Sequence, residues 1–380
     1  LSRITQSVGG AVLGAGLFIA AFPLLYWNEG RAVQTMKSLE EGQGALVKAS
    51  ADRVDPQNEL KLVQLSGETQ TRDVLRDPDF GVKAQAIRLL RDAEMYQWKE
   101  NRRSETRKKL GGGEETVTTY SYEKAWVDHL LDSGRYKETG HDNPGSMKYE
   151  SKKLEASNVT LGAYRLSGEQ ISKIGGAATL EVGSDAPLEN APRRAKVKAD
   201  GVVYVGESPD TPRIGDERIS FRVVKPGPLS VIGQQTGDTF QPYQTKAGDA
   251  LLLVQDGIHA PGEMFQKAQA DNATLTWILR VVGFALMLIG LAMAFKPLSV
   301  LADVVPFIGS MVGAGMGVFA FLISVALSLL TIGLAWVAHR PLLGVPLLLV
   351  SGGALYLVFA RGRKKLRAKA GWTPGLGNAA

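Results

Sequence analysis

Cysteine is absent from the chain of 380 residues. Its absence excludes disulfide bonds, zinc sites built on thiolates and thiol-based catalysis. The motifs of several other enzyme classes are missing as well. The sequence contains no G-x-S-x-G nucleophile elbow, no H-E-x-x-H zinc motif and no phosphate-binding P-loop. We therefore predict a protein that is not an enzyme, with no catalytic residue, no metal ligand and no cofactor.

Charged residues are lacking in four long apolar runs. Val8–Trp27, Met311–Val337 and Leu342–Phe359 contain none, and Trp277–Phe295 contains only Arg280. A helix rises about 1.5 Å per residue and a bilayer core is about 30 Å thick, so about 20 apolar residues cross it. Each run therefore predicts a transmembrane helix. The alternatives are buried helices of a large soluble core and, for the first run, a cleaved signal peptide.

Acidic residues are missing from the C-terminal tail, Arg361–Ala380, which contains six basic residues and accounts for the whole formal charge of +6. Basic residues next to a span mark the cytoplasmic side. They also attract anionic lipid. Since the rest of the chain is neutral, a nucleic-acid partner is not expected. The candidate lipid-binding residues are Arg361, Arg363, Lys364, Lys365, Arg367 and Lys369.

Four spans place both termini in the cytoplasm and the long middle segment outside it. In chain order, we predict a cytoplasmic N-terminus (1–7), a transmembrane helix (8–27), an extracytoplasmic domain (28–276), transmembrane helices at 277–295, 311–337 and 342–359, and a basic cytoplasmic tail (361–380). Residues 296–310, between the second and third spans, are predicted to be an interfacial or re-entrant cytoplasmic segment. A plain loop is the alternative there.

The middle domain is predicted to be β-rich. Met95–Arg103 and Glu115–Trp126 flank three glycines at 111–113, a pattern typical of a β-hairpin. Further strand-like runs are separated by Pro-Gly and Gly-Asp pairs. These runs are Val202–Val205, Ile219–Val224, Leu229–Gly233, Phe240–Thr245 and Ala250–Val254. The fold class is thus an integral membrane protein with one N-terminal and three C-terminal transmembrane α-helices, and with a large β-rich (α+β) domain between the first and the second.

Three finer predictions concern this domain. Arg31–Ala49 and Val82–Arg91 have helical spacing of apolar residues, and the former is expected to end at glycines 42 and 44. The tetrapeptide at 65–68 recurs at 166–169, which suggests two related β modules. The hairpin aromatics are expected to form a core face, with a membrane or ligand surface as the alternative. These aromatics are Tyr96, Trp98, Tyr120, Tyr122 and Trp126.

Pairs of small residues four apart occur in two of the spans. Helices in lipid gain little by burying apolar groups, so close backbone contact is important for their packing. Gly10 and Gly14 in the first span, and Gly313 and Gly317 in the third, are therefore the helix-packing candidates. They would pack within one chain or between copies, and we expect a homo-oligomer. A second candidate cluster, Asp128, His129, His141 and Asp142, does not match a recognised metal site, and solvated polar residues are the preferred interpretation.

Several short fragments, in this order and with this layout of spans, resemble the transmembrane protein 43 (LUMA) family along nearly the whole chain. The fragments are Asn28-Glu29-Gly30-Arg31, Asp77-Pro78-Asp79-Phe80-Gly81, Glu94-Met95-Tyr96-Gln97-Trp98, Tyr120-Ser121-Tyr122, His141-Asp142-Asn143-Pro144, Gly215-Asp216, Ile219-Ser220-Phe221 and Arg340-Pro341-Leu342. The resemblance implies one span, a large luminal domain and three further spans. It also implies a scaffold that associates with lamins and emerin in the endoplasmic reticulum and inner nuclear membrane.

The chain departs from this family in its glycine-rich, basic end, and its alanine- and glycine-rich composition indicates a bacterial relative. We therefore expect the bacterial inner membrane, with the large domain in the periplasm, and membrane lipids and other membrane proteins as partners. The preferred function is a non-enzymatic membrane organiser or scaffold that self-associates. A transporter or channel subunit is the alternative, but transport usually places polar or charged groups at mid-bilayer, where these spans have little besides Ser and Thr.

Overall fold

The computed structural model describes residues 2–108, 114–183, 188–302 and 306–340, with 345–346, 349–350, 352–353 and 356. The chain divides into two compact units. The helical unit comprises Leu1–Lys37, Lys108–Glu115 and Lys267–Ala380, and the β-rich unit comprises Ser38–Arg107 and Thr116–Gln266. The basic tail lies outside the described residues, as does most of the fourth predicted span, Leu342–Phe359.

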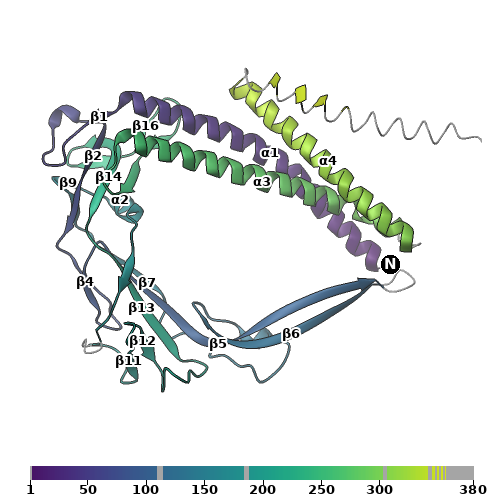
Figure 1. The fold of residues 1–380 in the computed structure, drawn as a ribbon, viewed down its shortest axis with the longest axis horizontal. Coiled ribbons are helices and arrows are strands. Elements are labelled where there is room, and N and C mark those ends of the chain that lie inside the picture. Colours follow the sequence, from purple (N-terminus) through teal and green to yellow (C-terminus); the bar gives the residue numbers. More distant parts are fainter. Residues whose placement is uncertain are drawn as a thin grey trace, which may run out of the picture. The chain divides into compact units, whose positions relative to one another are not determined.

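Three long helices run side by side (Figure 1). They are α1 (Ser2–Ala45), α3 (Pro261–Ala302) and α4 (Pro306–His339). Each contains a segment long and apolar enough to cross a membrane, within Gly9–Ala45, Pro261–Lys296 and Met316–His339 respectively. Three of the four predicted spans therefore fall in such helices, and the β-rich segment lies between the first and the second of them.

Helix α1 is longer than predicted, because the expected first span and the expected helix at Arg31–Ala49 form one continuous element. Pro23 lies inside it without ending it. Gly42 does not end it either. A Cβ atom at Gly42 would lie 2.4 Å from Leu251 and 3.4 Å from the Phe265 ring, so this glycine permits close packing. The prediction of a helix stop at glycines 42 and 44 was therefore wrong for Gly42, whereas α1 does end at Ala45, one residue after Gly44.

The first sheet of the β-rich unit is centred on β2 (Leu62–Thr71) and β14 (Pro228–Thr236). Its strand order is β15-β14-β2-β8-β9, with β1 beside β2 and β18 beside β14. The other strands are β1 (Val47–Lys48), β8 (Val159–Leu161), β9 (Tyr164–Arg165), β15 (Thr239–Gln241) and β18 (Leu253–Asp256). Inward-facing Val63, Leu65 and Val231 pack with Ile171 of the short helix α2 (Gly168–Lys173) to form one hydrophobic core.

The second sheet is built on β5 (Arg88–Lys108) and β13 (Glu217–Val224), which pair antiparallel along the whole of β13. Its order is β11-β12-β13-β5-β6, with β10 beside β13 and β7 beside β5. The other strands are β6 (Glu114–Val127), β7 (Lys152–Glu155), β10 (Ala178–Leu180), β11 (Ala195–Val197) and β12 (Val203–Val205). Leu89, Phe221 and Phe80 belong to a second hydrophobic core on this sheet.

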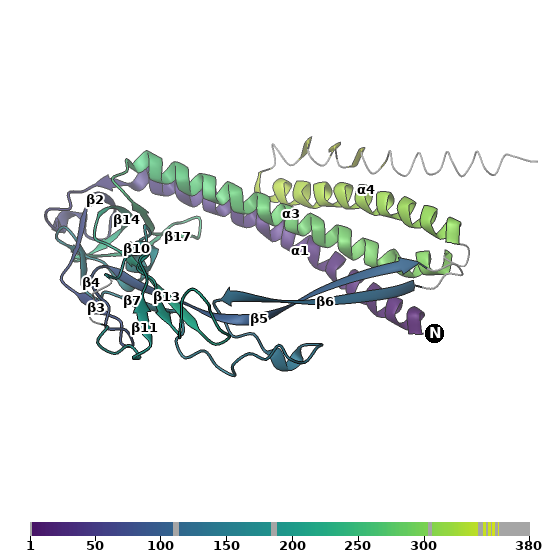
Figure 2. The ribbon, with the colours of Figure 1, turned by 60° about the horizontal axis from the view of Figure 1, so that its bottom comes forward.

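The predicted hairpin is confirmed as β5 and β6, which lie next to each other as two long strands (Figure 2). The strand-like runs of the second half are confirmed in β12 to β15 and in the short strands that follow. Two small antiparallel pairs complete the unit. They are β3 (Val74–Arg76) with β4 (Lys83–Gln85), and β16 (Tyr243–Gln244) with β17 (Ala250–Leu251).

Two other predictions for this unit were wrong. Val82–Arg91 is not a helix but contributes to β4 and the start of β5, because pairing with β7 and β13 overrides its local apolar spacing. The recurring tetrapeptide also marks no structural repeat. Its first copy lies within β2, whereas in its second copy Ser167 caps α2 with a capping box to Gln170.

The hairpin aromatics do not form a domain core. They are half-buried, whereas Met95 and Gln97 on the other face of β5 are buried. Trp126 lies 5.1 Å from the ring of Tyr96 and has the Arg218 guanidinium 4.8 Å from its ring centre. The prediction failed because cations and a neighbouring loop, instead of a second apolar layer, cover this face.

A buried ion pair holds the turn at Asp77–Gly81 against the second sheet. The Arg91 guanidinium donates to both carboxylate oxygens of Asp77, at 3.1 and 2.9 Å, and also bonds Asp79. Asp77 in turn accepts the backbone N–H groups of Asp79 and Phe80. The side chains of Asp77 and Arg91 are only 1% and 5% exposed. Water therefore could not solvate either charge if its partner were removed.

We expect Arg91→Met to lower the free energy of unfolding of the β-rich unit by about 3–5 kcal/mol, because it leaves the Asp77 carboxylate buried without a cation. Arg222→Met is the matched control. Arg222 also binds an aspartate, Asp92, but its side chain is 46% exposed, so the expected loss is at most about 1 kcal/mol. Urea unfolding of the full chain in mild detergent, followed by pulse proteolysis, measures both. Equal losses would contradict the assignment.

Candidate functional site

Helices α1 and α3 pack against each other along a seam with alternating spacings of three and four residues. On α1 the seam includes Phe18, Ala21 and Leu25, and on α3 it includes Gly283 and Met287. Ala21, Leu25 and Met287 are fully buried. Such spacing keeps one stripe of each helix facing its neighbour, as in left-handed helix pairs.

The closest approach in this seam involves two glycines. A Cβ atom at Gly14 would lie 2.6 Å from Cβ of Met293 and 2.7 Å from the carbonyl oxygen of Gly290. A Cβ atom at Gly290 would lie 2.6 Å from the carbonyl oxygen of Gly14. The backbones of α1 and α3 therefore touch where neither helix has a side chain, a contact typical of helices in lipid.

At its other end the seam becomes polar. The guanidinium of Arg280 on α3 donates to both carboxylate oxygens of Glu29 on α1, at 2.6 and 2.8 Å. The indole N–H of Trp336 on α4 donates to the same carboxylate at 2.5 Å. Glu29 is 1% exposed. Three helices thus converge on one buried carboxylate, and both of its oxygens are occupied.

A second set of hydrogen bonds lies next to this carboxylate. Arg31 of α1 donates to the side-chain oxygens of Asn272 (2.9 Å), Thr276 (3.0 Å) and Asn28 (3.3 Å). The Asn28 amide donates to the carbonyl of Thr276, and the Asn272 amide donates to the carbonyl of Ala32. Arg31 therefore binds neutral oxygens, and these bonds tie α1 to α3 over one further turn.

Helix α4 also contacts the Asn28–Arg31 segment of α1. A Cβ atom at Gly30 would lie 3.0 Å from Nε2 of His339, so a larger residue would require this imidazole to shift by a few tenths of an ångström. The His339 ring also lies 6.1 Å from that of Tyr26. Together with the Trp336 bond to Glu29, these contacts fix the C-terminal end of α4 to α1. We call the set formed by Asn28, Glu29, Arg31, Asn272, Thr276, Arg280 and Trp336 the polar clasp.

The predicted packing glycines have different environments. Gly14 lies in the α1–α3 seam, against Gly290 and not against the predicted Gly313/Gly317 pair. Among the described residues, a Cβ atom at Gly10 or Gly317 would meet nothing within 4 Å, and the surroundings of Gly313 lie outside the described side chains. The six basic lipid-binding candidates of the tail also lie outside the described residues.

Sequence reasoning missed Gly290 and the partner of Arg280. The spacing of Phe18, Ala21, Leu25 and Asn28 continues past the end of the predicted first span, and this spacing could have indicated that Glu29 belongs to the same seam. The four residues weighed and set aside as a metal cluster, Asp128, His129, His141 and Asp142, all lie in the described part of the chain. Asp128 and His129 form an exposed pair, whereas the ring of His141 stacks on Tyr122 at 3.8 Å, and the described part of the chain contains no cluster of three possible metal ligands.

A bundle of apolar helices with a buried polar clasp, interrupted by a large β-rich insert, defines a multi-pass integral membrane protein. The chain belongs to the transmembrane protein 43 family, whose model matches residues 95–341. It is 36% identical to transmembrane protein 43 of Mus musculus, over 90% of this chain and 87% of the relative. The human protein is 35% identical over 93% and 90%, and the Drosophila melanogaster homologue 31% over 92% and 94%. No solved structure matches the chain.

We expect Gly14→Leu to destabilise the helical unit, because the new side chain would occupy space that Met293 and Gly290 already fill. Overpacking of this kind costs about 1–3 kcal/mol or more. Gly10→Leu is the control one turn away, at a position with open space around it. Thermal unfolding in mild detergent compares the two. Similar unfolding temperatures for both variants would contradict the α1–α3 contact.

Proposed function

We propose that the protein is a non-enzymatic membrane organiser, or scaffold, that self-associates and presents its β-rich domain outside the cytoplasm. The observation that carries this proposal is the closed state of the polar clasp. Both carboxylate oxygens of Glu29 accept hydrogen bonds from Arg280 or Trp336. The side chains of Asn28 and Thr276 are also hydrogen-bonded within the chain. A transport site needs charged groups that exchange their partner for a solute. The bonds of the polar clasp are instead suited to holding the helices together.

The aromatic residues around the clasp support a position at the membrane surface. Trp27 and Trp277 are 57% and 63% exposed, and each lies within three residues of Glu29 or Arg280 in sequence. Exposed tryptophans in membrane helices gather at the level of the lipid headgroups. The clasp would then lie at the interface, with Arg280 and Trp336 near the ends of stretches 277–295 and 311–337, and the other apolar residues of 8–27, 277–295 and 311–337 would cross the bilayer.

The same proposal covers topology and compartment. With a fourth span at 342–359, both termini face the cytoplasm, the tail at 361–380 binds anionic lipid, and residues 28–276 face the periplasm of a bacterial inner membrane. In a eukaryotic host they would face the lumen of the endoplasmic reticulum or the perinuclear space. Each basic residue near an anionic surface contributes about 1 kcal/mol to lipid attraction.

Topology can be tested directly because the chain has no cysteine of its own. We expect an impermeant maleimide to label Gly112→Cys, in the hairpin loop, on intact cells or, for an internal membrane, on sealed vesicles with the domain outward. Gly375→Cys in the tail should react only after permeabilisation. Labelling of Gly375→Cys but not Gly112→Cys on the intact preparation would reverse the proposed orientation.

Self-association can be tested by native mass spectrometry in mild detergent and in nanodiscs. We expect wild type to be an oligomer, and a variant with leucine at both Gly313 and Gly317 to be a monomer, since Gly317 has open space beside it in the single chain. Gly16→Leu, at a glycine of the first span that is not a packing candidate, is the matched control and should keep the wild-type mass. A wild-type monomer in both media would contradict self-association, and saturable solute flux in liposomes would favour the transporter.

A further inference from the structure

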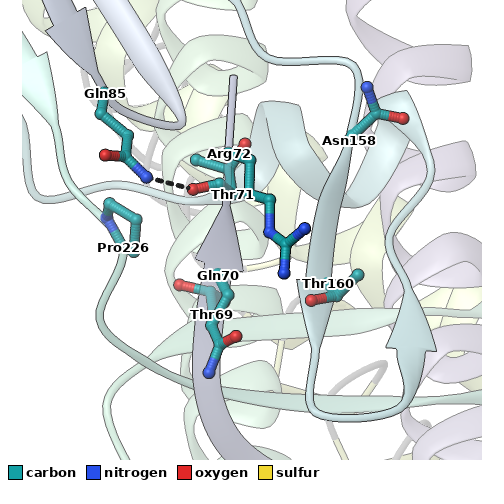
Figure 3. Close-up of a pocket in the computed structure, with 8 residues that line it drawn as sticks. All are labelled: Thr69, Gln70, Thr71, Arg72, Gln85, Asn158, Thr160 and Pro226. Atoms are coloured by element: carbon teal, nitrogen blue, oxygen red, sulfur yellow. Dashed lines mark hydrogen bonds between the residues drawn. The ribbon is translucent and has the colours of Figure 1, made fainter. Parts of the chain in front are cut away.

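A cavity of about 630 Å³ lies in the β-rich unit, where β2 meets β8 (Figure 3). In the ladder between these strands Gln70 is paired with Thr160. Arg72 directly follows the last residue of β2, and Thr160 lies beside Gln70 across the ladder. Gln85 and Pro226 also line the cavity, which is open to solvent, and Gln70, Arg72 and Gln85 are exposed. Its volume is within the range of about 300–1,000 Å³ typical of small-molecule sites.

Several hydrogen-bonding groups that line this cavity have no partner among the described residues. Among the residues that the structure describes, none bonds to the Arg72 guanidinium, the Gln70 amide or the Thr160 hydroxyl. In Figure 3 the guanidinium extends from the end of β2 toward β8, where Thr160 lies. Gln85 is partly used, since its amide N–H donates to the carbonyl of Thr71 at 2.8 Å, but its side-chain oxygen is free to accept. An arginine side chain has five N–H donors and a permanent charge.

In the described part of the chain, no carboxylate forms an ion pair with Arg72. None of the residues that line the cavity is acidic. The adjacent Asp73 is turned away and accepts the N–H groups of Ser157 and Asn158 at 2.8 and 2.9 Å and the Asn158 amide at 3.2 Å. These bonds, the backbone N–H of Asn158 foremost, hold the pKa of Asp73 below its usual range. The cavity therefore has a net positive charge and free neutral donors and acceptors around it.

We propose that this cavity binds a small polyol that carries a phosphate or carboxylate group. Arginine binds either anion through two parallel hydrogen bonds. The Gln70 amide, the Thr160 hydroxyl and the Gln85 oxygen then provide partners for ligand hydroxyl groups on the same side. A soluble sugar acid or polyol phosphate and the headgroup of an anionic glycerolipid share this chemistry. The proposal does not depend on the organiser function.

Isothermal titration of the full chain in nanodiscs of zwitterionic lipid tests it with two probes, glycerol 3-phosphate and glucuronate. We expect saturable binding of at least one probe, and weaker binding of uncharged glycerol. Arg72→Gln should weaken binding at least tenfold, and Thr160→Val severalfold from the other strand. Arg53→Gln is the matched control, because Arg53 is an exposed arginine of the same unit that does not line the cavity. It should leave the dissociation constant within twofold of wild type.

Adding short-chain phosphatidylglycerol separates the two sources of the ligand. Competition with the bound probe assigns the cavity to a lipid headgroup, and lack of competition assigns it to a free solute. Absence of saturable binding for both probes would overturn the proposal. Equal weakening by Arg72→Gln and Arg53→Gln would also overturn it, because the effect would then come from overall charge. Binding of glycerol as tight as that of the charged probes would overturn it too.

Discussion

The ion pair between Glu29 and Arg280 is the interaction on which the helical unit depends. A charge held among apolar helices is costly unless it is paired, and either residue alone would disfavour this packing. Pairing them fixes which turn of α1 faces which turn of α3, and the indole of Trp336 extends the same restriction to α4. Apolar packing further along the seam selects the register of the two helices less strongly, since a leucine side chain fits many grooves of a neighbouring helix. The clasp therefore supplies register, and the glycine contact at Gly14 and Gly290 supplies close packing.

This arrangement explains how one chain carries a large insert between two spans. Residues 28 and 276, which begin and end the predicted extracytoplasmic segment, meet through the bond from the Asn28 amide to the Thr276 carbonyl. This bond holds the two ends of the insert together and does not involve the fold of the insert itself. Within the insert, stability comes from two separate hydrophobic cores and from buried pairs such as Asp77–Arg91. Neither core contains a disulfide, since the chain has no cysteine.

The sequence was sufficient for the features that depend on local pattern. Long apolar runs identified three helices that the structure contains, and aromatic alternation around three glycines identified the β5–β6 hairpin. Local sequence pattern failed where a residue distant in the sequence determines the secondary structure or the side-chain partner. Val82–Arg91 has helical spacing but forms β structure because β7 and β13 pair with it. Arg280 was recognised as unusual, but its partner Glu29 lies 251 residues away and beyond the predicted end of the first span. The free donors around Arg72 had no sequence signal, because they lie on two strands whose register only the fold reveals.

The central claim is that Glu29 and Arg280 act as one unit that holds α1, α3 and α4 together. A double-mutant cycle with Glu29→Gln, Arg280→Met and the double variant tests it, with the free energy of unfolding of the helical unit measured by steric trapping in bicelles. Each single change should cost about 3–5 kcal/mol, since it leaves the other charge buried and unpaired. The double variant should cost less than the sum, with a coupling energy above about 1 kcal/mol. Additive effects, within about 0.5 kcal/mol, would contradict the account.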